Sequence, residues 1–193
     1  MIQLSSNVIE YFPGDSIGDE ASGYIKIALA GSDSYEPSGA YDWQRKFAEG
    51  LVQLSDPNSG TGLIMYKNMK FAVLNCKSAN PPANFSLDIN NQEAVNKISS
   101  NLDFCAVADG IFLNFLKKSE SLMPVFQFGY LAKTGRLVVR CPDEYKYHAL
   151  VSVICQREQI PLYPGRLTNV LTILQGLLTL PNIAQMQQLQ LPE

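Results

Sequence analysis

The chain has 193 residues, of which 46% are hydrophobic and 17% charged, and its net charge is −3. This composition predicts a folded globular protein with one main domain and argues against disorder. Because the net charge is negative, the chain has no excess of positive charge to bind a phosphate backbone, and nucleic acid is not an expected partner. Small ligands or other proteins are the expected partners.

The cysteines and the single histidine limit the disulfides, metal sites and catalytic groups that the chain can form. Four cysteines are far apart with no CxxC pair, which favours buried thiols over disulfides or a metal site. His148 is the only histidine, so multi-histidine metal sites are excluded, and a surface or capping role is favoured over a catalytic one. A metal site built from these side chains is therefore not expected.

The chain shows neither a signal peptide nor a membrane span. The first twenty residues lack a basic region followed by an apolar core, and no run reaches eighteen apolar residues. We therefore expect a protein without a membrane partner, located in the cytoplasm or, if encoded by a phage, in the virion.

The N-terminal third predicts an arm followed by a strand and a helix. Residues 1–22 are mixed in character and are expected to form an arm or edge strand ahead of the main fold. The run "YIKIALAGS" becomes continuously apolar, as a strand buried on both faces does. In "DWQRKFAEGLVQL" apolar residues recur at helical spacing, and Asp42 is placed to cap the helix.

Strands and helices then alternate along the chain. Strands are expected at 71–74, 109–115, 136–141 and 160–163, with helices at 92–107, 123–133 and 143–158 between them. This alternation predicts crossover connections and a doubly wound, five-stranded parallel sheet of the flavodoxin-like (Rossmann-like) α/β class, over residues 23–164.

The last segment, residues 165–193, predicts a helix and a glutamine-rich tail. Leucine and valine side chains form one stripe over 167–178, and Pro181 is expected to end the helix. A helix packed on its own domain is favoured over a surface that joins another subunit, and both interpretations stay open.

In an open parallel sheet the ligand crevice lies outside the carboxyl ends of the strands. The stretches that follow the strands begin at Gly31, Asn75, Asn114 and Cys141. The next helix begins near Ser121 to Pro124, which puts Gln127 about one turn in, at the end with the positive helix dipole. A carboxylate there could act as a nucleophile, whereas an amide cannot ionise.

The order of these pieces resembles the nucleoside 2-deoxyribosyltransferase-like family. The matching segments, all within residues 24–163, are "IALAGS", "DWQRKFAEGL", "VLNCKS", "LDFCAVADGIFLNF", "FQFGYLAKTGRLVVRCPDEY" and "ICQREQIPLY". The resemblance implies a flavodoxin-like fold and cleavage of the N-glycosidic bond of deoxynucleosides without a metal or redox cofactor. It also implies a glutamate nucleophile within an "ELG"-like motif.

The resemblance places this glutamate at Gln127 of "FQFG". Two further polar positions of the family fall on Pro124 and Leu116. Because three reactive positions differ together, we expect no catalytic residue. The residues that we expect to line a residual ligand pocket, for which packing alone is an equal alternative, are Gly31, Ser32, Trp43, Asn75, Lys77 and Gln127.

Three functions follow as hypotheses. The first is a catalytically degenerate relative that still binds a nucleoside or nucleotide. The second is an active deoxyribosyltransferase or N-glycosidase with a relocated carboxylate, for which the candidates are Asp33, Asp88, Glu120 and Asp143. The third is an oligomeric structural subunit, such as a phage virion component, that contacts other subunits through its N-terminal arm or C-terminal tail.

Overall fold

The computed structural model describes residues 1–32, 43–56, 58, 66, 69–77, 90–119, 121–165 and 170–190. The chain divides into two compact units. The first contains residues 1–28 and 34–108, and the second contains residues 29–33 and 109–193. Strand β3 (Ile25–Gly31) runs from the first unit into the second. The predicted Asp42 cap lies outside the described residues.

The described residues form a seven-stranded, mostly parallel sheet and six α-helices, an α/β arrangement that agrees with a Rossmann-like class. The strand order is β1-β2-β4-β3-β5-β6-β7, in which β4-β3-β5-β6-β7 repeats the 2-1-3-4-5 order of flavodoxin-like sheets. The sheet therefore has two strands more than the five we expected. Both additional strands come from the N-terminal segment.

In the first unit, β1 (Ile2–Gln3) pairs antiparallel with β2 (Val8–Tyr11), and β2 pairs parallel with β4 (Phe71–Asn75). Helix α1 (Trp43–Ser55) packs on β2 and β4, and α2 (Gln92–Val107) has the bounds that its sequence predicted. Of the two alternatives expected for this segment, an arm or an edge strand, the structure shows the second, with β1 at the edge of the sheet. Strand β2 was hard to recognise because Glu10 interrupts a short apolar run that is buried throughout.

In the second unit, β5 (Gly110–Asn114), β6 (Leu137–Arg140) and β7 (Leu162–Tyr163) pair in parallel. Helix α3 (Met123–Leu131) connects β5 to β6, and α4 (His148–Arg157) connects β6 to β7. Helix α4 begins five residues later than the expected start at 143, because backbone turns close from Pro142 to Tyr145 and from Tyr145 to His148.

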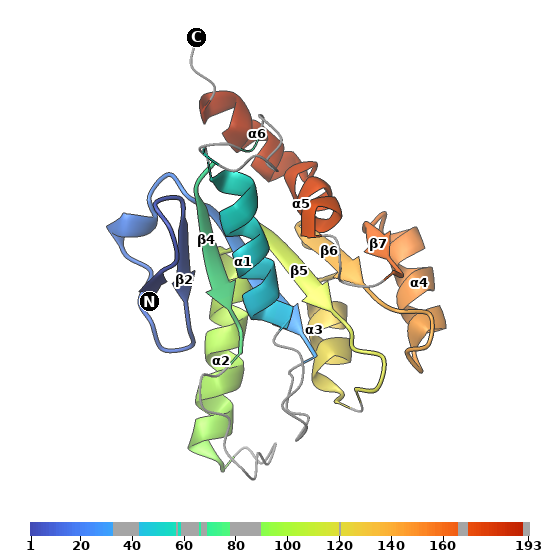
Figure 1. Cartoon of the computed structure of the whole chain (residues 1–193). Helices are drawn as coiled ribbons and strands as arrows, with labels where there is room; N and C mark the ends of the chain where they lie inside the picture. The colour runs from blue at the N-terminus through green and yellow to red at the C-terminus, as the bar shows by residue number, and fades with distance from the viewer. Residues whose placement is uncertain are drawn as a thin grey trace. The chain divides into compact units, whose positions relative to one another are not determined.

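The C-terminal helices pack on their own unit. Helix α5 (Val170–Leu178) lies against β5 and β6 (Figure 1), and α6 (Pro181–Gln190) packs against α5. A side chain at Gly110 would collide with Leu177 and Ile183, so the glycine lets these helices approach the sheet closely. Pro181 follows the end of α5 and also occupies the first turn of α6, where proline is well tolerated.

Candidate functional site

The switch point of the sheet lies between β3 and β5. The chain leaves β3 for a strand on one side of it and later enters β5 on the other side, and ligands of open α/β sheets bind where the order reverses. The last residues of these strands are Gly31 and Asn114, both within the second unit. This edge is therefore the first place to look for a site.

Gly31 and Ser32 make a close backbone contact with Asn114. Gly31 has a φ of +116°, and a Cβ atom on it would collide with the Asn114 backbone, so the position requires glycine. The Ser32 N–H donates to the Asn114 carbonyl at 2.8 Å, and the Ser32 hydroxyl oxygen accepts from the Leu116 N–H at 3.0 Å. Both predicted residues thus connect β3 to the segment after β5.

Gln127 lies beside the same backbone. Its carboxamide oxygen accepts a hydrogen bond from the Gly31 N–H at 3.0 Å, and only 4% of the residue is exposed. The structure therefore brings three predicted residues, Gly31, Ser32 and Gln127, together at one end of the second unit. The Gln127 oxygen satisfies a backbone donor there, and its amide has no proton to gain or lose in acid–base work.

Asn114 has an unsatisfied donor at this edge. Its Oδ1 atom accepts from Arg140 Nη1 at 2.8 Å, whereas its buried Nδ2 atom has no hydrogen-bond partner among the described residues. Arg140 also donates to the carbonyls of Phe115, at 3.3 Å, and Gly165, at 2.8 Å. The sequence pattern did not identify Arg140 as a site residue. Arg140 is the last residue of an apolar strand, and we considered only the residues that follow each strand.

The other three predicted residues belong to the first unit. Trp43 is completely buried in the core at the start of α1. Asn75 donates from Nδ2 to Glu10 Oε1 at 2.8 Å and accepts from the Lys77 N–H at 2.9 Å. Glu10, which sequence reasoning missed, is a carboxylate of which only 6% is exposed. The only signal was an acidic residue at the centre of an otherwise apolar run.

The structure gives no support to the four acidic residues that we considered as relocated nucleophiles. Asp33, Asp88 and Glu120 lie outside the described residues. The Asp143 side chain is 77% exposed, and its carboxylate lies 3.5 Å from His148 Nε2. An exposed carboxylate of this kind has no buried surroundings that would tune it for catalysis.

His148 does not form a Ser-His-Asp relay. The Ser152 hydroxyl lies 3.0 Å from His148 Nε2, which is the same nitrogen that Asp143 approaches, and the buried Nδ1 atom has no partner among the described residues. A relay needs the serine and the carboxylate on opposite ring nitrogens. The position at the start of α4 agrees with a structural histidine.

The four cysteines are buried and form no disulfide among the described residues, as expected. Burial raises the pKa of Cys141 from its ordinary value to about 12, with a contribution from neighbouring Cys155. Burial also raises the pKa of Cys155 to about 11. Both thiols therefore stay protonated at neutral pH, and neither serves as a nucleophile or a metal ligand in that state.

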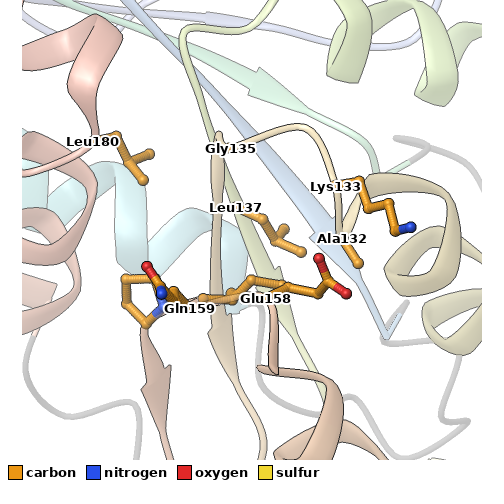
Figure 2. A pocket seen from close by; sticks show the side chains of 9 residues that line it. Ala132, Lys133, Gly135, Leu137, Glu158, Gln159 and Leu180 are labelled. Carbon is orange, nitrogen blue, oxygen red and sulfur yellow. The ribbon is translucent and has the colours of Figure 1, made fainter. Parts of the chain in front are cut away.

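A cavity of about 300 Å³ lies at the opposite edge of the second unit, near the amino ends of β6 and β7 (Figure 2). Its walls come from the ends of α3 and α4, the start of β6, the segment before β7, and Leu180. None of its lining residues was among the sequence-predicted site residues. Sequence reasoning missed it because it searched only the carboxyl ends of the strands.

Within the described part of the chain, no cluster of three or more metal-ligating side chains is present, and no helix is long and apolar enough to cross a membrane. Neither a scan against protein-family models nor a search of curated proteins found a match for this chain.

Proposed function

We propose that this chain is a non-catalytic nucleoside- or nucleotide-binding protein built on a deoxyribosyltransferase-like fold. The observation that carries the proposal is the hydrogen bond between the Gln127 carboxamide oxygen and the Gly31 N–H. The resemblance assigns the nucleophilic carboxylate to this position. An uncharged amide that completes a backbone hydrogen bond serves structure, and it cannot form a glycosyl intermediate as an ionised carboxylate does.

Two neighbouring positions support the loss of chemistry. Pro124 and Leu116, which stand where the resemblance implies polar side chains, offer no group that could hold or move a proton. Restoring a carboxylate at Gln127 alone would therefore leave the remaining polar groups missing. We expect Gln127→Glu to remain inactive toward deoxynucleosides.

The unpartnered Asn114 donor supports retained binding. A buried N–H group without an acceptor costs about 1–3 kcal/mol, so an acceptor that reaches it stabilises the folded protein. Nucleosides and nucleotides carry hydroxyl, carbonyl and, for nucleotides, phosphate oxygens that can accept this bond. Asn114 lies at the switch point of the sheet. Open α/β sheets bind such ligands at this point.

The test combines a binding assay with a turnover assay on the full chain. Deoxynucleosides and their monophosphates are added in a thermal-shift experiment, where a ligand at one hundred times its Kd contributes about 2.7 kcal/mol. The same mixtures are analysed by chromatography for free base. We expect stabilisation without base release. Enzymatic base release would contradict the proposal, and so would the absence of a shift with every compound.

Asn114→Asp is the informative variant. It keeps the oxygen that accepts from Arg140 and removes the unpartnered Nδ2 donor, so we expect the ligand-induced shift to disappear. The matched control is Asn96→Asp on the exposed face of α2, which keeps the acceptor for Gln92. An unchanged shift in Asn114→Asp would remove the role proposed for Asn114.

A second candidate function, self-association in an assembly, is favoured by one surface. Leu122, the N-cap of α3, and Phe126 and Tyr130 within the helix follow one another at four-residue spacing, and they are 51%, 69% and 70% exposed. No charged residue lies within α3, so two copies of this face could meet without like-charge repulsion. Of the terminal segments first considered for assembly, β1 pairs with β2, and the described helices α5 and α6 pack within the second unit.

Light scattering after size exclusion tests this second candidate. We expect an oligomer that dissociates in Phe126→Ser/Tyr130→Ser. The control is Leu150→Ser/Val153→Ser, which replaces two exposed apolar side chains on α4 and should leave the mass of the oligomer unchanged. A monomeric wild-type chain would exclude self-association through α3.

A further inference from the structure

The cavity near the amino ends of β6 and β7 combines an apolar floor with opposite charges. Polar and apolar atoms contribute about equally to its lining. The polar side chains are Lys133, Glu158 and Gln159, the apolar ones are Ala132, Leu137, Ile160, Pro161 and Leu180, and Gly135 adds backbone. Its volume of about 300 Å³ is at the lower end of the range for ligand pockets. A ligand with a small apolar body and polar groups would fit this lining.

The two charged side chains of the cavity do not neutralise each other. Lys133 and Glu158 form no ion pair with one another, and the Glu158 carboxylate has only a 3.6 Å contact with the largely exposed Arg157. Exposed pairs of this kind contribute little. A positive and a negative group that line one cavity without pairing can instead bind a ligand that carries both complementary charges.

The helix ends add a preference for where each charge binds. Helix α3 ends at Leu131 and α4 at Arg157, and both ends contribute to the cavity wall through Ala132 and Glu158. The carboxyl end of a helix carries partial negative charge. Both helix ends therefore favour a ligand ammonium group near the Glu158 carboxylate. A ligand carboxylate would be attracted by the Lys133 ammonium group alone, against the partial negative charge at the end of α3.

Gln159 supplies an independent observation. Its φ is +56°, and it is the non-glycine residue with a positive φ in the described part of the chain. The turn that Gln159 makes after α4 is closed by a hydrogen bond from the Ile160 N–H to the Cys155 carbonyl at 2.9 Å. In such turns the residue with the positive φ is usually glycine. After α3 the chain uses Gly135, with a φ of +68°. An amide side chain is thus kept at the cavity despite a less favourable backbone conformation.

We propose that this cavity binds a free α-amino acid with an aliphatic side chain. The ammonium group pairs with Glu158, the carboxylate pairs with Lys133, and the aliphatic body packs on Leu137 and Leu180. Figure 2 shows the Glu158 carboxylate beside Ala132 and Leu180 on the other side, and the Lys133 side chain extends outward from the Ala132 side. In Figure 2 the Gln159 amide lies at the end opposite to the Glu158 carboxylate, where it can donate or accept a further hydrogen bond.

Calorimetric titration of the full chain tests the proposal with three probes of one shape. L-Leucine carries both charges, isopentylamine carries only the ammonium group, and 4-methylpentanoate carries only the carboxylate. We expect saturable binding of L-leucine with a Kd of about 1 mM or below, and binding about tenfold weaker or absent for the two others. No saturable binding of L-leucine, or equal binding of a singly charged probe, would overturn the proposal.

Four charge variants identify the site. Lys133→Gln and Glu158→Gln should each weaken L-leucine binding about tenfold. Lys118→Gln and Glu93→Gln make the same charge changes at exposed positions outside the cavity lining and should leave binding unchanged. If all four variants bind equally, the site is wrong. Asn114→Asp should retain L-leucine binding, which separates this proposal from the function proposed for the carboxyl-end site.

Discussion

The Gly31 N–H and the Gln127 carboxamide oxygen, 96 residues apart in the chain, are joined by a 3.0 Å hydrogen bond at the end of β3. Gly31 needs its positive φ because a side chain would collide with the Asn114 backbone. Its N–H must then find an acceptor, since a buried unpaired donor is costly. Gln127 supplies that acceptor, so the two residues depend on each other.

Gln127→Leu should therefore destabilise the protein. Leucine is close to glutamine in size but leaves the Gly31 N–H without its acceptor, which should lower the free energy of unfolding by about 1–3 kcal/mol. Urea denaturation measures the difference. Gln156→Leu on the exposed side of α4 is the control and should change stability by less than about 0.5 kcal/mol. Equal effects of the two variants would show that the hydrogen bond contributes little.

Gly31→Ala should be among the most destabilising single changes. It combines a backbone conformation unfavourable for alanine with a collision against backbone atoms that cannot easily move, for a loss of about 3 kcal/mol or more. Gly14→Ala is the matched control, since Gly14 has a φ of +97° but no atom within 4 Å of the added methyl group. It should cost only about 1–2 kcal/mol. Thermal or urea unfolding of both variants distinguishes collision from backbone strain.

Stability should decrease in alkaline solution. The folded state holds the Cys141 and Cys155 protons up to pKa values of about 12 and about 11, whereas an unburied thiol releases its proton near its ordinary value of 9.0. The folded state therefore binds more protons above pH 9, and the free energy of unfolding falls as the pH rises from there toward 11.

The thiol contribution can be isolated from other alkaline effects. Burial and the hydrogen bond to Glu20 raise the pKa of Tyr11, which adds to the same trend. Between pH 8 and pH 10 the free energy of unfolding of Cys141→Ala/Cys155→Ala should fall less steeply than that of the wild type. The difference in slope should correspond to on the order of one to two fewer protons released on unfolding. Parallel pH profiles for the two proteins would contradict this assignment.

Gln159→Gly should have opposite effects on stability and on ligand binding. Glycine adopts the left-handed conformation of this position more easily, so the variant should be more stable by about 0.5–1 kcal/mol. It should also bind L-leucine more weakly, because the amide is lost. Gln156→Gly within α4 is the control and should destabilise by about 1 kcal/mol. A Gln159→Gly variant with unchanged L-leucine affinity would exclude a ligand contact for the amide.

Much of the local structure could be predicted from the sequence. The apolar run at Ile25–Gly31 and the helical spacing of Gln92–Val107 identified their elements because burial on two faces and helical periodicity are properties of neighbouring residues. The α/β alternation likewise followed from local patterns. The identity of Gln127 as an amide was sufficient to question catalysis at that position.

Contacts between distant segments were decided only by the tertiary structure. The pairing of Val8–Tyr11 with Phe71–Leu74, and the burial of Glu10 against Asn75, depend on a partner strand more than sixty residues away. The cavity likewise gathers the ends of two helices with Leu180. Sequence patterns report which face of an element is apolar, whereas the partner of each face depends on the packing of the whole chain, and this is why the Gly31–Gln127 hydrogen bond could not be predicted.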